Sequence, residues 1–543
     1  MQIAFLAATL ILGAAGDADV VVVCPAAFSP ALKPWLDYRT AQGYRIARVS
    51  NEQTPVAIRE AIRATAKSGN LRAVVLVGDA DPRAVRDARI RAVTIPTHKA
   101  KAKVNVLWGS EPEIATDNWY ADLDDDQLPD VPIGRLSADT PEQLSRIIQK
   151  TLAYEQQHRR GLWQRRVNFV AGVGGFGKLA DSVLEGTTKK FLTDTLPAAY
   201  EISMTYGSWR SPFCPDPRHF RQATLDRLNE GSVFWVYIGH GQRRYLDRIH
   251  TPAGAYPILD TDDIVKLQRG AGSPIAVFLA CYTGAFDELR DSLGEELLRS
   301  SDGPVAVYCG SRVTMPYAMA VMANELMTQY FRERRATLGE VVMQAKRRMA
   351  HTLSESEQAQ QVNRHILDAL AAVISPAPDQ LDDERQEHVL LFNLLGDPLL
   401  KLDHPQEIEV MLGEDVRAGS ELLVAANSPI SGRCTVELVC RRDRMKMKPP
   451  VRDRFNPSDE ALAAYDRIYA AANDRTWAAH TFDCRSGEFI TTLDVPKEAR
   501  GPCVVRVFAE NDRLHAVGAA EVFVRRPVRP TEERSPTTAS PGS

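Results

Sequence analysis

Between residue 19 and about residue 400, short runs of apolar residues alternate with longer stretches of amphipathic, helix-like pattern. The runs at 73–77 and 275–280 are apolar throughout, whereas a strand with one face in water would alternate apolar and polar residues. Such strands belong in parallel sheets that helices cover on both faces. The alternation predicts an α/β fold, with apolar runs at 20–24, 73–77, 167–171, 233–238, 275–280 and 305–308 and helical stretches at 58–66, 141–154, 179–192 and 318–331.

The chain of 543 residues is too long for a single hydrophobic core, so several domains are expected. The α/β pattern restarts after the charged stretch 158–166, which predicts two sheet units, an N-terminal subdomain at 17–160 and a second at 161–404. From about residue 405, short β-prone runs broken by Gly, Pro, Asn and Asp predict a β-sandwich at 405–525, with a helical insertion at 457–473. The Pro-, Ser- and Thr-rich residues 526–543 are predicted to be disordered.

The N-terminal residues 1–16 contain an apolar run, 3–15, that ends in small residues before Asp17. This pattern is typical of a signal peptide, although no Lys or Arg precedes the run, so a buried first strand or helix is the alternative. No other stretch has the roughly 20 apolar residues of a membrane span. The formal net charge of −4 gives no basis for binding nucleic acid. We therefore expect a secreted or cell-envelope-associated protein with no membrane span in the mature chain.

The cysteine pattern argues against a structural metal centre. None of the eight cysteines forms a CxxC pair of the kind that zinc ribbons use. Four of them lie in the predicted β-sandwich, where one or two disulfides could form if the protein is exported. The spacing leaves their connectivity open; the four are Cys434, Cys440, Cys484 and Cys503.

Two strand ends carry residue types that suit nucleophilic catalysis. The run 233–238 leads into Gly239-His240-Gly241, and the run 275–280 leads into Cys281. Ligands of an open parallel sheet gather beyond the carboxyl ends of its strands, so we expect both side chains to face one crevice. An imidazole beside a cysteine favours the thiolate, which attacks acyl groups. Taken singly, each residue is more often structural, and only the pairing favours catalysis.

The residues beside this pair suggest an oxyanion hole. A glycine has no Cβ, so its backbone N–H can approach a substrate carbonyl closely. We therefore expect the amides of Gly241 and Cys281 to stabilise the oxyanion. Cys24 and Cys309 also stand near strand ends, but no His-Gly pair neighbours them, and we expect both to be packed.

Six motifs stand in a fixed order between residues 19 and 404, and together they resemble the gingipain-type cysteine peptidases. The resemblance implies a caspase-like catalytic region of two α/β subdomains, followed by an immunoglobulin-like sandwich. It also implies that His240 and Cys281 match the catalytic dyad of the family. The motifs are Val74-Val75-Leu76-Val77-Gly78-Asp79; Asp117-Asn118-Trp119-Tyr120 with Pro129-Asp130-Val131-Pro132-Ile133-Gly134-Arg135-Leu136; Tyr154-Glu155; Tyr237-Ile238-Gly239-His240-Gly241; Leu279-Ala280-Cys281-Tyr282-Thr283-Gly284-Ala285-Phe286; and Leu395-Gly396-Asp397-Pro398.

The loop at 172–177 departs from the family pattern. In the family's best-known members this loop carries one acidic residue that supports the histidine and another that selects basic side chains, whereas here it has no carboxylate. Asp181, a few residues later, is the substitute we consider. Three nearby arginines, Arg243, Arg244 and Arg312, would repel basic side chains if one faced the crevice. We therefore predict weak or no preference for Arg and Lys, while the substrate-binding residues stay unassigned.

Two weaker patterns point to ligands. The loop at 172–178 nearly spells a phosphate-binding loop, but Leu179 stands where a Ser or Thr is required, so we expect a tight turn. Carboxylates at Asp122, Asp124 and Asp126 have the spacing of the first calcium-loop positions, yet the required Gly and final Glu are missing. A solvated turn is the favoured interpretation and structural calcium the alternative.

These observations predict a cysteine-type endopeptidase that acts on protein or peptide substrates. Cys281 attacks, His240 transfers the proton, and no metal or organic cofactor is required. Two alternatives stay open: a surface-protein transpeptidase that uses the same dyad, and a non-catalytic adhesion protein built on a peptidase scaffold.

Overall fold

The computed structural model describes residues 18–156, 161–173, 195–354, 357–358 and 361–526. The chain divides into two compact units, one that runs to His404 and also takes in Pro449–Asn473, and one that holds Pro405–Lys448 and the chain from Asp474 onward. The predicted signal peptide at 1–16 and all but the first residue of the predicted tail at 526–543 lie outside the described residues. No helix among the described residues is long and apolar enough to cross a membrane.

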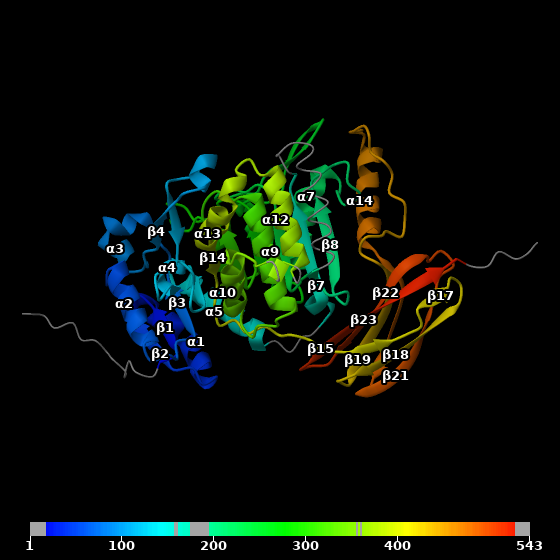
Figure 1. Ribbon diagram of the computed structural model, residues 1–543, viewed down its shortest axis with the longest axis horizontal. Helices are drawn as coiled ribbons and strands as arrows, with labels where there is room; N and C mark the ends of the chain where they lie inside the picture. The colour runs from blue at the N-terminus through cyan, green and yellow to red at the C-terminus, as the bar shows by residue number, and fades with distance from the viewer. Residues whose placement is uncertain (1–17, 157–160, 174–194, 355–356, 359–360, 527–543) are drawn as a thin grey trace, which may run out of the picture. The chain divides into compact units, whose positions relative to one another are not determined.

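The first unit is built on one ten-stranded sheet (Figure 1). Its strands pair in parallel in two blocks, and β14 joins them, antiparallel to β13 on one side and bridged to β6 through Leu395 and Arg135 on the other. The two sheet units expected for 17–160 and 161–404 are therefore one sheet, because β14 closes the gap between them. In spatial order the strands are β2 (Ile46–Val49), β1 (Val20–Val23), β3 (Ala73–Val77), β6 (Ile133–Leu136), β14 (Phe392–Leu395), β13 (Ala306–Gly310), β12 (Ile275–Leu279), β9 (Phe234–Ile238), β7 (Arg166–Ala171) and β8 (Glu201–Tyr206).

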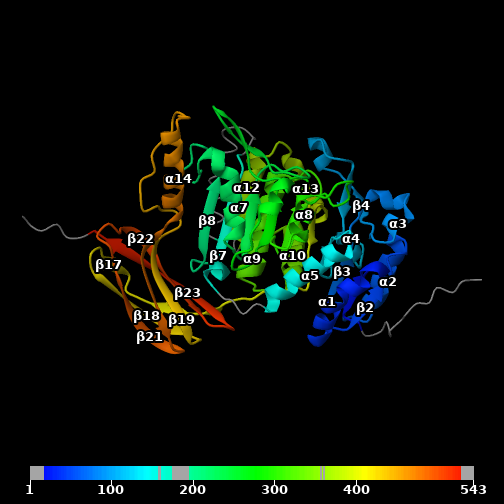
Figure 2. The same ribbon diagram turned by 180° about the vertical axis from the view of Figure 1, so that it is seen from behind.

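Helices cover both faces of this sheet, as the apolar strands predict (Figures 1 and 2). Successive residues of a strand point to opposite faces, so Trp235 and Tyr237 of β9 belong to one core while Phe234 and Val236 belong to the other. The first core is closed by α1 (Ser29–Ala41), α5 (Pro141–Gln156), α7 (Phe220–Asn229) and α8 (Leu293–Arg299), and the opposite face by α2 (Pro55–Ala66), α9 (Pro316–Phe331), α10 (Leu338–Ala350), α12 (Val362–Ile374) and α13 (Leu381–Leu391).

Buried ion pairs tie distant segments of this unit together. Arg39 of α1 is fully buried and donates to both Glu155 of α5 (2.7 Å, Nη2 to Oε1) and Asp397 (2.6 Å, Nη2 to Oδ2) after β14. Arg135 of β6 donates through Nε and Nη2 to both carboxylate oxygens of Asp117, each bond 2.7 Å long. Buried charges need such partners because the transfer of an unpaired ion out of water is costly. The first pair links α1 to α5 and to the turn after β14, and the second links β6 to the start of α4 (Asn118–Ala121).

A short antiparallel hairpin stands between β3 and β6 in the chain and is formed by β4 (His98–Lys101) and β5 (Glu113–Thr116). It reaches the segment that follows β13, where Ser311 Oγ donates to the carbonyl of Ala115 (2.8 Å). Arg312 Nε donates to the carbonyl of Glu113 (2.9 Å). The hairpin therefore brings residues from the first quarter of the chain to the strand ends of the second half.

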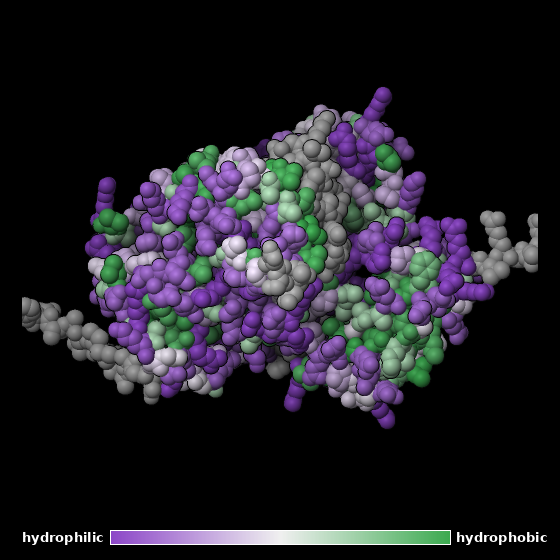
Figure 3. Space-filling view, viewed as in Figure 1, coloured by the Kyte–Doolittle hydropathy of each residue, from purple (hydrophilic) through white to green (hydrophobic). Residues whose placement is uncertain are grey.

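The second unit consists of two mainly antiparallel sheets around one hydrophobic core, so an α/β region is followed by a β domain. Alternate residues of its strands point inward, with Leu422 and Val424 buried while Leu423 between them is 58% exposed. Figure 3 shows hydrophobic residues gathered on the visible face of this unit. One sheet has β15 (Gln406–Glu407), β23 (His515–Arg525), β22 (Gly501–Glu510), β19 (Gly432–Cys440), β20 (Thr476–Cys484) and β17 (Asp415–Arg417); the other has β16 (Glu409–Met411), β18 (Glu421–Ser428) and β21 (Gly487–Asp494).

The four cysteines of this unit are buried and free in the structure, and disulfides between them on export stay a prediction. Cys440 of β19 lies directly opposite Cys503 of β22 in the antiparallel ladder. The immunoglobulin-like character of this unit stays a prediction.

The helical insertion is α14 (Asp459–Asn473), and its segment packs with the first unit, although the chain enters and leaves it from the second. Asn473 pairs with edge strand β8 on both sides of Met204, since it accepts from Met204 N (2.8 Å) and donates to Met204 O (3.0 Å). Arg452 donates to the carbonyl of Ser211 (2.6 Å) and lies 3.7 Å from the ring centroid of Tyr465. The predicted span 405–525 therefore includes a segment that belongs structurally to the α/β unit.

Candidate active site

The histidine turn follows β9 and is held by its main chain. Tyr237, fully buried in β9, donates its hydroxyl hydrogen to the carbonyl of His240 (2.8 Å), and Asp247 N donates to the same oxygen (3.2 Å). Gly239 has a φ of +154°, and a Cβ there would lie 2.8 Å from the Tyr237 hydroxyl. The sequence Gly-His-Gly is therefore what lets the chain fold tightly over Tyr237, and the side chain of His240 stays half-buried.

The cysteine turn follows β12, the strand beside β9. The parallel ladder pairs Ile238 with Leu279, so His240 and Cys281 each stand two residues beyond the last pair. Cys281 is the half-buried cysteine of the chain, and the other seven are buried. The sequence prediction that both residues follow equivalent strand ends agrees with this register.

The two turns are in van der Waals contact through Gly241. A Cβ at this position would lie 2.6 Å from the carbonyl oxygen of Cys281 and 2.8 Å from Cγ2 of Thr283. Only glycine therefore fits here, because any side chain would push the two turns apart. Gly241 lies opposite Leu246 in a short antiparallel bridge. The hydrogen bonds of this bridge run from Gln242 N to Tyr245 O (2.9 Å) and from Asp247 N to His240 O (3.2 Å), so they do not use the Gly241 amide.

The sulfur of Cys281 contacts a third segment, which leads into α9. Thr314 N donates to Sγ over 3.3 Å, and the Thr314 hydroxyl lies 3.6 Å from the same sulfur. The same hydroxyl lies 3.1 Å from Sδ of Met319, so the amide is the donor that is directed at the Cys281 sulfur alone. Thr314 carries no motif in the sequence, and only its place just before a helix start would have drawn attention to it.

A buried histidine, His388, contacts the segment that leads into α9. His388 of α13 accepts a hydrogen bond from Met315 N through Nε2 (2.8 Å), while its Nδ1 pairs with the carbonyl of Glu384 (2.7 Å). Burial lowers the pKa of His388 to about 4, so the ring is neutral and its Nε2 is an acceptor at neutral pH. Met315 directly follows Thr314, so the bond to His388 of α13 also holds the Thr314 amide in place beside the Cys281 sulfur.

Three arginines lie around the two turns, and two of them are paired with carboxylates. Arg243 donates to Glu111 and to Glu288, and Arg312 is buried against Asp287 with an Nη1–Oδ1 distance of 2.8 Å. Arg244 donates from Nη1 to the carbonyl of Asp291 (3.0 Å) and from Nη2 to Thr261 Oγ1 (2.8 Å). Arg243 and Arg312 are thus neutralised by carboxylates, whereas both acceptors of Arg244 are uncharged. The weak preference for basic side chains stays a prediction.

The predicted acidic support for His240 cannot be placed. Gly172 donates its amide hydrogen to Ile238 O (2.9 Å), beside the histidine turn. The continuation of that loop from residue 174, the phosphate-loop resemblance with Leu179, and Asp181 lie outside the described residues.

The acidic run at 122–126 forms a turn with carboxylates at its centre. Asp122 accepts from the amides of Asp125 (2.7 Å) and Gln127 (3.1 Å). Oxygens of Asp122, Asp124 and Asp130 come within 4.8 Å of one another, which is a spacing that a cation can bridge. Backbone donors occupy the oxygens of Asp122, as in a self-contained turn, and structural calcium stays a prediction.

The fold and site define an open α/β sheet in which a cysteine and an imidazole follow adjacent strands. The sequence model of peptidase family C25 matches residues 14–403, so the chain belongs to that family. Family membership supports a cysteine peptidase.

Individual relatives are distant. Lys-gingipain W83 from Porphyromonas gingivalis is 25% identical over 303 residues, which are 54% of this chain and 15% of the relative. Lys-gingipain of P. gingivalis strain ATCC 33277 is 24% identical over 305 residues, again 15% of its length. The chain thus matches only a small part of the curated relatives.

Solved structures share the fold over nearly the whole chain. The crystal structure of the Arg-specific cysteine proteinase gingipain R superposes with a TM-score of 0.51 at 16% identity, covering 94% of this chain and 98% of that one. A complex of the P. gingivalis RgpB pro- and mature domains gives a TM-score of 0.51 at 17% identity, covering 93% of this chain and all of the matched chain. At these identities the likeness concerns the fold.

Proposed function

We propose that this protein is a cysteine-type endopeptidase in which Cys281 is the nucleophile and His240 the general acid and base. The observation that carries the proposal is the register of β9 and β12, which sets both residues two positions beyond the last paired residues of neighbouring strands. Half-burial of both side chains leaves them open to a substrate. A cysteine peptidase needs this combination of a reactive thiol, a nearby imidazole and access.

Hydrolysis proceeds through a thioester. His240 takes the proton of the Cys281 thiol, and the sulfur bonds to the substrate carbonyl carbon, whose oxygen becomes an oxyanion. The C–N bond then breaks as the imidazolium returns its proton to the leaving amine. Water, deprotonated by His240, attacks the thioester and releases the carboxylic acid and Cys281. These steps use no metal or organic cofactor.

The amides of Gly241 and Cys281 are the proposed oxyanion donors. The position of Gly241 N outside the ladder of its own turn supports this role, since a donor already committed within the fold would be unavailable. The close packing of Gly241 against Cys281 O brings the two amides into one small region. Loss of a single oxyanion donor typically costs ~100- to 1,000-fold in rate.

Cleavage of a diverse peptide library by wild type and by Cys281→Ala tests the proposal. We expect the variant to lose turnover by at least ~1,000-fold, because the covalent route disappears. Cys309→Ala, which removes the buried thiol of the next strand, is the matched control and should retain turnover as long as it stays folded. Library cleavage that survives Cys281→Ala would refute the assignment.

The same experiment separates the open alternatives. Mass spectrometry of products with an added amine distinguishes hydrolysis from transpeptidation, since an amine that resolves the thioester appears in the product. A wild-type protein that cleaves nothing in the library and transfers nothing would favour the non-catalytic adhesion protein.

Specificity remains a separate proposal. The relatives carry Lys-gingipain as a name, and gingipain R is described as Arg-specific, whereas the loop at 172–177 here has no carboxylate. A pocket for Arg or Lys needs a paired carboxylate because an unpaired cation is costly to bury. We propose weak preference for Arg and Lys, and strong cleavage after Arg that Asp181→Asn abolishes would refute it.

Export through the apolar segment at 3–15 is also part of the proposal. N-terminal sequencing of protein recovered outside the producing cell should begin at or near Asp17.

A further inference from the structure

Glu111 lies in the short segment before β5 and belongs to none of the motifs in the sequence. Its carboxylate contacts both turns of the proposed active site. Oε2 accepts from the hydroxyl of Tyr282 (2.8 Å), the residue directly after Cys281. Oε1 accepts from Nη2 of Arg243 (2.5 Å), three residues after His240. One carboxylate from the N-terminal half of the chain thus joins the histidine turn to the cysteine turn.

The Tyr282 backbone needs such a hold. Its φ is +57°, a left-handed conformation that bulky residues seldom adopt. Conformations of this kind persist only when the surroundings impose them, and they gather at functional sites. The amide of Tyr282 donates to Arg312 O (3.0 Å), and its ring is buried to 9% exposure. The bond to Glu111 fixes the far end of the same side chain.

Arg243, which follows the histidine turn, contacts both Glu111 and the ring of Tyr282. Its guanidinium lies 4.4 Å from the ring centroid of Tyr282, while its carbonyl accepts from Leu293 N (2.7 Å) at the start of α8. Glu288 also accepts from Arg243, through Nε (2.9 Å). Of the two carboxylates bonded to Arg243, Glu111 is the one that also bonds Tyr282 among the described residues.

We propose that Glu111 is a positioning residue that holds Cys281 and His240 in their relative places by bonding Tyr282 and Arg243. The inference rests on the proposed function of those two residues. Charge-assisted hydrogen bonds to a carboxylate are stronger and shorter than neutral ones, which suits this task. Reaction rates fall steeply when a nucleophile is displaced, about 100-fold for a shift near 1 Å.

Steady-state kinetics of Glu111→Ala and Glu111→Gln test the inference, with Glu288→Gln as control because it contacts Arg243 but not Tyr282. We expect kcat of Glu111→Ala to fall about 100-fold with KM changed less than about threefold. Glu111→Gln keeps an acceptor for the Tyr282 hydroxyl and should recover at least a tenth of wild-type kcat. Glu288→Gln should stay within about twofold of wild type.

A second readout needs no turnover. The rate of Cys281 alkylation should fall at least about fivefold in Glu111→Ala and stay unchanged in Glu288→Gln, because displacement of His240 takes away the base that accepts the thiol proton. Should Glu111→Ala fail to fold, Tyr282→Phe, which removes only the hydroxyl, is expected to reproduce part of both losses. Combined with Glu111→Gln, its effect should be less than additive.

Two results would overturn the inference: wild-type kcat and alkylation in Glu111→Ala, or a raised KM at unchanged kcat, which would make Glu111 a substrate-binding residue. Failure of the proposed function is visible separately, as turnover that survives Cys281→Ala. In that case the alkylation rates still decide whether Glu111 positions Cys281.

Discussion

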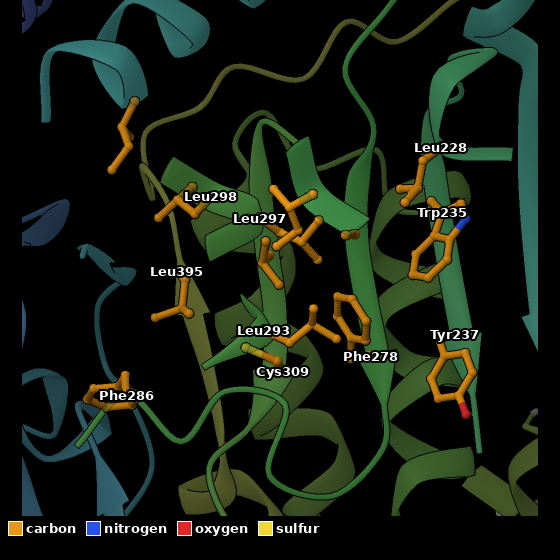
Figure 4. Packing of buried hydrophobic residues seen from close by; sticks show 14 of the residues in the cluster. Leu228, Trp235, Tyr237, Phe278, Phe286, Leu293, Leu297, Leu298, Cys309 and Leu395 are labelled. Carbon is orange, nitrogen blue, oxygen red and sulfur yellow. The ribbon is translucent and has the colours of Figure 1, made fainter. Parts of the chain in front are cut away.

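Two cysteines stand on neighbouring strands of the first unit, and they have opposite surroundings. Cys309 lies within β13, paired with Phe278 of β12, and is completely buried. Cys281 stands beyond the last pair of β12 and is half-buried. Figure 4 shows Cys309 inside the apolar cluster beside Leu293. A place near the end of a parallel strand is therefore not enough to make a cysteine reactive.

The two cysteines differ in how deeply the sulfur is buried and in the hydrogen-bond donors around it. Burial raises the pKa of Cys309 well above its usual range, and the charge of Glu295 adds to the effect, so its thiol stays protonated. The sulfur of Cys281 instead has the amide and hydroxyl of Thr314 within 3.3 and 3.6 Å. The turn after β12 carries its cysteine out of the core, and the segment before α9 supplies the donors.

The largest expected effect is selective alkylation. Limited iodoacetamide at neutral pH should modify Cys281 at least ~1,000 times faster than Cys309, because only the accessible thiolate reacts. Cys24 should behave like Cys309, since burial raises its pKa to about 11. Mass spectrometry of tryptic peptides reads both rates, with unfolded protein as the control for equal intrinsic reactivity. Loss of activity with label mainly on another cysteine would break the comparison.

An overpacking substitution probes the buried member. In Gly284→Ala the new Cβ would lie 2.3 Å from the sulfur of Cys309, so the cysteine turn and β13 must separate. Overpacking of this kind costs about 1–3 kcal/mol of unfolding free energy. Urea denaturation measures the loss, and adding Cys309→Ala should recover part of it. An unchanged midpoint in the single variant would mean that the turn is looser than its contacts indicate.

The sequence predicted six of the ten strands of the first unit, because these six are short and largely apolar, but it divided them between two sheets. The runs at 73–77 and 167–171 are β3 and the core of β7, and the helical pattern at 141–154 is α5. The other four strands, β2, β6, β8 and β14, were missed, and β14 has only four residues directly after a helix, too few to show a period of their own. The insertion around α14 was recognised as helical, but local pattern cannot reveal which unit a segment packs against.

Only some residues of the candidate site could be predicted from the sequence. His240 and Cys281 could be proposed as a pair because each follows an apolar run, which is a local signal, and their catalytic roles stay a prediction. Glu111 and Thr314 come from distant segments and act through tertiary contacts, so neither spacing nor composition marks them. Several motif residues proved to be structural instead, among them Glu155 and Asp397, which neutralise the buried Arg39.

The smallest expected effect concerns the Thr314 hydroxyl beside Cys281, the half-buried cysteine of the pair. Thr314→Val keeps the shape of the side chain and the backbone amide but removes the hydroxyl that lies 3.6 Å from Sγ. A single hydrogen bond contributes about 0.5–1.5 kcal/mol, and this long contact to sulfur belongs at the lower end, so Cys281 alkylation at neutral pH should slow about two- to fivefold. Thr314→Ser retains the hydroxyl and should match wild type, which separates the hydrogen bond from packing. A rate in Thr314→Val equal to that of wild type would mean that the hydroxyl hydrogen goes to Sδ of Met319, 3.1 Å away, and that the Thr314 amide is the Thr314 donor that acts on Cys281.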